Sequence, residues 1–113
     1  MIKEFETSKN SLVVYLHGEI DQYAAAELKT RIDIEVKSST KRNLIIDLSH
    51  VELMDSSGIG LIVGRYKLTT SLGGKFAVCN ASDYVKKMIE LSGITKVINY
   101  YSNVSEAEKA FIN

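Results

Sequence analysis

Short strand-like runs alternate with segments of helical periodicity along this chain, and that alternation constrains its fold more than any other feature. The order is two strands, then three helix–strand pairs, then a final helix. Strands separated by a helix are normally parallel, with right-handed crossovers. We therefore predict an α/β domain with a mostly parallel five-stranded sheet. The expected strands are Ile2–Thr7, Leu12–His17, Leu44–Leu48, Phe76–Cys79 and Val97–Tyr100, and the first two helices are Gln22–Val36 and Ser56–Ser71.

Polar residues mark where the elements begin and end. Ser8-Lys9-Asn10 is a turn signal, so the first two strands should pair antiparallel, and Gly18 should end the second. Asp21 stands at the N-cap position of the first helix. Ser82 can cap a third helix that Gly93 ends, and Asn103 can cap a last helix ending near Phe111.

The predicted strands alternate in a way that indicates unequal faces of the sheet. Leu12, Val14 and Leu16 share one face, as do Leu44, Ile46 and Leu48. The opposite face carries polar residues, so we expect it to be only partly covered. This favours a short βα superhelix whose helices lie mainly on one face.

Two segments should meet at one rim of this sheet. The segments 18–21 and 49–57, both expected to be loops, follow the carboxyl ends of neighbouring strands. Open α/β sheets usually bind their ligands at that rim.

Length and composition exclude several classes of function. The 113 residues make one domain, expected to span residues 1–113, and 14 basic residues balance 14 acidic ones. A net charge of zero argues against non-specific electrostatic binding to nucleic acid or to a membrane surface. One cysteine and two distant histidines leave few metal ligands, so we expect no metal and no cofactor. With no secretory signal or apolar span, we expect a cytoplasmic protein.

The segment Met54-Asp55-Ser56-Ser57-Gly58-Ile59-Gly60, continuing to Gly64-Arg65-Tyr66-Lys67, resembles the signature of STAS-family anti-sigma factor antagonists. The similarity is greatest to the sporulation members of that family. Gly18-Glu19-Ile20-Asp21 and Leu91-Ser92-Gly93-Ile94 match two further family segments. The resemblance covers essentially the whole chain, and it implies the same βα superhelix.

The resemblance implies a phosphorylation switch without enzymatic activity. Ser56 matches the serine that an anti-sigma factor, acting as a serine kinase, phosphorylates in the family. In the family, the unphosphorylated antagonist binds the anti-sigma factor and so releases the sigma factor. The phosphorylated form cannot bind until a phosphoserine phosphatase removes the phosphate. The expected partner-binding residues are Asp21, Asp55, Ser57, Gly58, Ile59 and Gly60. The free chain is expected to be a monomer.

The residues themselves suit this chemistry. A serine at a helix start offers an exposed hydroxyl, and the helix N-terminus tolerates an added phosphate. Gly58 and Gly60 would let a partner backbone approach closely. Arg65, two helical turns after Gly58, would lie on a solvated helix face or form a salt bridge with the partner.

Three alternatives remain at this point. Ser57 competes with Ser56 as the phosphate acceptor, and general-stress antagonists of the same family share the fold and the switch. A serine-nucleophile or nucleotide-binding enzyme is the third. Its motifs fail: no glycine precedes either serine at nucleophile-elbow spacing, and Val63 occupies the third glycine position of a dinucleotide fingerprint. Cys79 is expected to be a buried thiol, and the two histidines structural.

Overall fold

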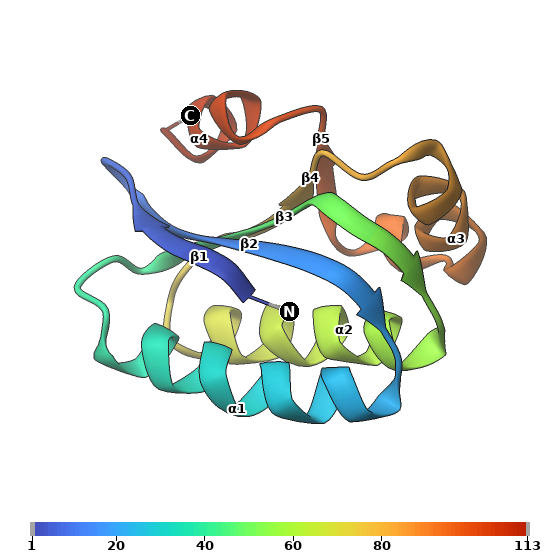
Figure 1. Ribbon diagram of the computed structural model, residues 1–113. Helices are drawn as coiled ribbons and strands as arrows, with labels where there is room; N and C mark the ends of the chain where they lie inside the picture. Colours follow the sequence, from blue (N-terminus) through green and yellow to red (C-terminus); the bar gives the residue numbers. More distant parts are fainter. Residues whose placement is uncertain (1, 113) are drawn as a thin grey trace.

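A computed structural model describes residues 2–112, without the side chain of residue 3, as a five-stranded sheet flanked by helices (Figure 1). The strands lie in the order β1-β2-β3-β4-β5; β1 is antiparallel to β2 and the other neighbours are parallel. This confirms the predicted mostly parallel sheet. The strands are β1 Ile2–Thr7, β2 Ser11–Ile20, β3 Asn43–Met54, β4 Phe76–Cys79 and β5 Asn99–Tyr101, and the helices are α1 Gln22–Ser38, α2 Ser56–Ser71, α3 Asp83–Ser92 and α4 Val104–Ile112.

The helices lie mainly on one face of the sheet, as predicted. Figure 1 shows α1 and α2 side by side beneath the strands and α4 above them. The larger core cluster joins the predicted inward residues of β2 and β3 to α1, α2 and α3. A smaller cluster on the opposite face joins Val13, Ile45 and Cys79 to Ala107 and Phe111 of α4. That face is therefore only partly covered.

Side-chain caps fix the helix starts where the sequence indicates them. Asp21 accepts hydrogen bonds from the amides of Tyr23 and Ala24, at 3.1 and 2.9 Å. Ser82 and Asn103 cap α3 and α4 in the same way. Each cap pairs amide groups that a helix start otherwise leaves without a partner.

The predicted ends of β2 and β3 are wrong. Gly18 does not end its strand: it has φ +83° beside a shift in register, and β2 continues to Ile20. Of the segment 49–57, predicted to be a loop, the part up to Met54 is strand, because β3 follows β2 as far as the pair Ile20–Met54. Both strands are thus longer than their apolar runs.

The last strand also differs from the prediction. A 3-10 turn, Ile94–Lys96, follows α3, and β5 begins only at Asn99. Val97 was expected to begin the strand, but it is exposed and precedes it. Among residues 2–112, no helix has the length and apolar character needed to cross a membrane.

Candidate functional site

The helix starts that follow β2 and β3 are neighbours on one rim of the sheet. Ile20 and Met54, the last residues of the two strands, are paired, and the amide of Asp55 donates to the carbonyl of Ile20 at 3.2 Å. Asp21 and Asp55, one residue further on, each begin a helix. The structure therefore brings together the two segments that the sequence placed at this rim.

Asp55 is the N-cap of α2. Its Oδ1 accepts the amide of Ser57 at 2.8 Å. The cap leaves Ser56 as the first residue of the helix, with an exposed side chain. Neither Ser56 nor Ser57 makes a side-chain hydrogen bond to any residue in the range 2–112, but Ser57 is half-buried. The geometry thus gives Ser56 the more accessible hydroxyl of the two.

The two glycines near the start of α2 have different surroundings. Gly60 is exposed, and a Cβ placed there would meet nothing within 4 Å. Gly58 is buried, and a Cβ there would lie 2.2 Å from Cγ of Met54. The expectation that Gly58 admits a partner backbone is wrong, because the space beside Gly58 is already filled by the side chain of Met54. The space beside Gly60 is open, so a partner backbone can still approach the helix there.

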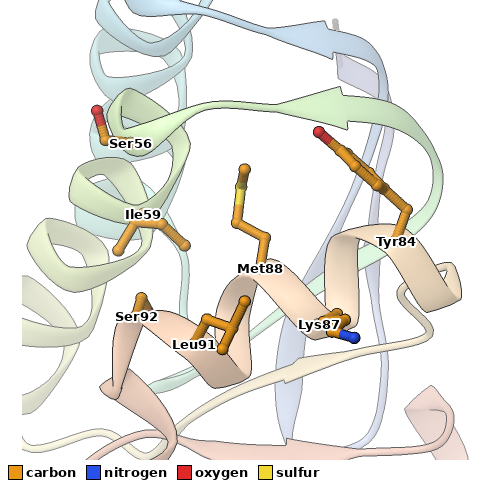
Figure 2. Close-up of a pocket in the computed structure, with 7 residues that line it drawn as sticks. All are labelled: Ser56, Ile59, Tyr84, Lys87, Met88, Leu91 and Ser92. Carbon is orange, nitrogen blue, oxygen red and sulfur yellow. The ribbon is translucent and has the colours of Figure 1, made fainter.

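An apolar groove of about 490 Å³ lies beside Ser56, between the start of α2 and α3. Figure 2 shows Ser56 and Ile59 on one side and side chains of α3 on the other. Tyr84 and Leu91 are 56% and 79% exposed. The groove is lined by Ser56, Ile59, Tyr84, Lys87, Met88, Leu91 and Ser92. Exposed apolar side chains gathered in a hollow are typical of a protein-binding surface.

The contribution of α3 to this groove was missed in the sequence, although a signal was present. Tyr84, Met88 and Leu91 have the spacing i, i+4, i+7, which places them on one helix face. Val85 and Ile89 face the core instead. A second apolar stripe beside the core stripe was the signal for a surface site.

Arg65 is neither solvated nor available to a partner, so both sequence interpretations of it are wrong. It is buried at 5% exposure, and its Nε lies 2.8 Å from Oδ1 of Asp33 on α1. The contact is an ion pair rather than an aligned hydrogen bond. Burial lowers the pKa of Arg65 from its ordinary value, and the Asp33 carboxylate partly offsets this. The pair joins α1 to α2.

The remaining candidate groups do not line the groove beside Ser56. Cys79 is buried, as expected. Burial, with a further contribution from Asp47, holds the pKa of its thiol well above the usual range. His50 Nδ1 lies 3.0 Å from the hydroxyl of Ser49. Within residues 2–112, no group of three His, Cys, Asp or Glu residues could hold a metal ion.

Comparison with known proteins adds independent information. The model of the family described as "STAS domain" matches residues 3–107. The anti-sigma F factor antagonist of Paenibacillus polymyxa is 33% identical over 100 residues, which are 88% of this chain and 86% of that protein. The anti-sigma-B factor antagonist of Listeria monocytogenes is 32% identical over 98 residues, 86% of this chain and 82% of that protein.

The solved structures show the same fold. The anti-sigma factor antagonist SpoIIAA in its unphosphorylated form superposes with a TM-score of 0.78 at 23% identity, covering 95% of this chain and 94% of SpoIIAA. SpoIIAA of Bacillus in its phosphorylated form gives a TM-score of 0.70 at 22% identity, covering 95% of this chain and 97% of SpoIIAA.

Proposed function

The chain belongs to the STAS domain family and is an anti-sigma factor antagonist, and from this premise we propose that phosphorylation of Ser56 decides whether it binds its anti-sigma factor. The unphosphorylated chain binds the anti-sigma factor and so releases a sigma factor. The anti-sigma factor also acts as the serine kinase, and a phosphoserine phosphatase reverses the modification. The exchange takes place in the cytoplasm, and the free antagonist is a monomer.

One observation carries this proposal: Ser56 presents an exposed side chain at the edge of an apolar groove. A kinase can reach such a hydroxyl, and a partner docked in the groove must pass beside it. SpoIIAA, which shares this fold, has been solved in a phosphorylated form. That precedent supports the same modification here.

The magnitudes favour blocked docking over refolding. Phosphate adds a charge of about −1.5 to −2. At an exposed helix start, the interaction with the helix dipole is worth only about 0.3–1 kcal/mol, and the neighbouring Asp55 carboxylate opposes it. A hundredfold loss of affinity needs about 2.8 kcal/mol, which desolvation of an unpaired dianion against an apolar surface easily exceeds. The backbone of the phosphorylated chain should therefore remain unchanged.

The test combines capture of the partner with intact-mass analysis. The wild-type chain should capture an anti-sigma factor and, with Mg-ATP, gain one phosphate. Ser56→Ala should bind constitutively and gain none, whereas Ser56→Asp should bind weakly. Ser57→Ala is the matched control, and it should still be phosphorylated. Binding of Ser56→Asp at wild-type strength would contradict exclusion by charge. Phosphorylation of Ser56→Ala would show that another residue is the acceptor.

A general-stress antagonist is the second candidate, because the Listeria relative, at 32% identity, is nearly as similar as the Paenibacillus one at 33%. The captured anti-sigma factor distinguishes them by the sigma factor that it binds. The enzyme alternatives gain no support from the groove, whose described lining contains no histidine or carboxylate to act as a base for Ser56. Hydrolysis of an activated ester, lost in Ser56→Ala, would revive them.

A further inference from the structure

We propose that Met54 is a positioning residue for Ser56: its side chain fills the space beneath Gly58 and so fixes the first turn of α2. The importance of this contact for phosphorylation rests on the function proposed above. The contact itself is a property of the fold, and it can be tested without the partner.

The contact between Met54 and Gly58 is unusually close. Met54 is the last residue of β3 and is buried at 4% exposure. A Cβ built on Gly58 would lie 2.2, 2.7 and 3.2 Å from Cγ, Sδ and Cε of Met54. Carbon atoms in ordinary contact are about 3.5–4 Å apart. An alanine at position 58 would therefore require more than about 1 Å of movement by the side chain or by the helix.

Both partners have little room to move. Met54 belongs to the main core cluster, so its side chain is packed and cannot turn into solvent without leaving that cluster. The other side of the turn is tied to the sheet, because the amide of Asp55 donates to Ile20 at 3.2 Å. The amide of Gly58 also donates to the carbonyl of Asp55 at 3.0 Å. Strain at Gly58 is thus passed to the residues between positions 54 and 58.

Ser56 lies at the centre of that short segment. Its side chain has no hydrogen bond within residues 2–112, so the backbone sets where its Cβ lies and thereby which positions the hydroxyl can reach. The adjacent cap, from Asp55 to the amide of Ser57 at 2.8 Å, depends on the same backbone. A displaced first turn would move the hydroxyl and weaken the cap together.

The test uses Ser56→Cys as a reporter. The native Cys79 is buried with a raised pKa, so a thiol at position 56 should be the only one that reacts rapidly with a disulfide reagent such as 5,5′-dithiobis(2-nitrobenzoate). A helix N-terminus favours the reactive thiolate, and loss of that favourable position should slow labelling about two- to fivefold. The rate is measured at pH 7 in four further backgrounds.

The expected pattern is specific. Gly58→Ala should slow labelling, and Gly58→Ala with Met54→Ala, which removes all three crowding atoms, should restore it. Met54→Ala alone should also slow labelling, since the turn then loses its support. Gly64→Ala, on the same helix with nothing within 4 Å of the new Cβ, is the matched control and should leave the rate unchanged. Circular dichroism verifies that each variant is folded.

Two results would overturn the proposal: unchanged labelling in folded Gly58→Ala, or slowed labelling that the double variant does not restore. If the double variant does not fold, Gly58→Ala alone still decides the first point. A parallel series with the native Ser56 measures kcat/KM for phosphorylation by the captured anti-sigma factor. The expected labelling pattern without any phosphorylation would leave Met54 as a positioning residue and reject the proposed function. Phosphorylation of Ser56, with labelling unaffected by Gly58→Ala, would support the proposed function and reject Met54 as a positioning residue.

Discussion

Truncation of Leu91 should weaken partner binding while leaving the fold intact. Its side chain lines the groove beside Ser56, and the residue is 79% exposed. Full burial of a leucine side chain contributes about 1.5–3 kcal/mol. If the partner buries the exposed 79%, Leu91→Ala loses about 1.2–2.4 kcal/mol of binding free energy, or roughly 7- to 50-fold in Kd. Its unfolding free energy should change by no more than about 0.5 kcal/mol.

Titration calorimetry with the captured anti-sigma factor measures the affinity, and urea unfolding measures the stability. Ile34→Ala is the matched control, because Ile34 is 62% exposed on α1 and does not line the groove. It should bind as the wild type does. An unchanged Kd for Leu91→Ala, with Ser56→Asp still weakened, would show that the partner does not enter the groove.

Three further predictions concern stability, each measured by urea unfolding. Asp55→Ala removes the cap of α2 and should cost about 1 kcal/mol; a loss above about 3 kcal/mol would contradict a simple cap. Arg65→Met leaves the Asp33 carboxylate with only the exposed ammonium of Lys29, 3.5 Å away, and should cost roughly 1–3 kcal/mol, less than a fully buried pair because the Asp33 side chain is 16% exposed. Adding Asp33→Leu should recover most of that loss, and no recovery would argue against coupling. The raised pKa of Cys79 keeps its thiol protonated in the folded state while the unfolded chain ionises above about pH 8.5, so stability should fall as pH rises from 8 to 9.5. Cys79→Ala should reduce that fall, and an equal fall in both proteins would refute this linkage.

The apolar runs made the central strands predictable, and the two-residue period assigned their side chains to faces. Leu12, Val14 and Leu16 enter the main core as expected, because one face of a half-covered sheet must be apolar. The same reasoning missed the end of β3. Between residues 49 and 54 only Val51 and Met54 are buried, and the register shifts there break the two-residue period. Backbone pairing with β2, rather than side-chain burial, extends the strand.

The environment of Arg65 could not be predicted from its own helix. Asp33 lies 32 positions earlier in the chain, and nothing local to either residue indicates the pair. Only the side-by-side packing of α1 and α2, which the parallel strand order imposes, brings the two side chains to 2.8 Å. Gly58 is a similar case, because its crowding depends on the rotamer of Met54 at the end of a strand.

The site is divided between two crossovers of the fold, and this has a consequence for specificity. Ser56 follows β3, whereas Tyr84, Met88 and Leu91 follow β4 on α3. The start of α2 is fixed by Asp55 and by the pairing of β3 with β2, and neither involves the groove side chains of α3. Substitutions at the exposed positions of α3 can therefore alter which partner surface fits the groove without moving the serine. The hydroxyl supplies the switch and α3 supplies much of the contact area, so affinity and phosphorylation should respond to different sets of substitutions.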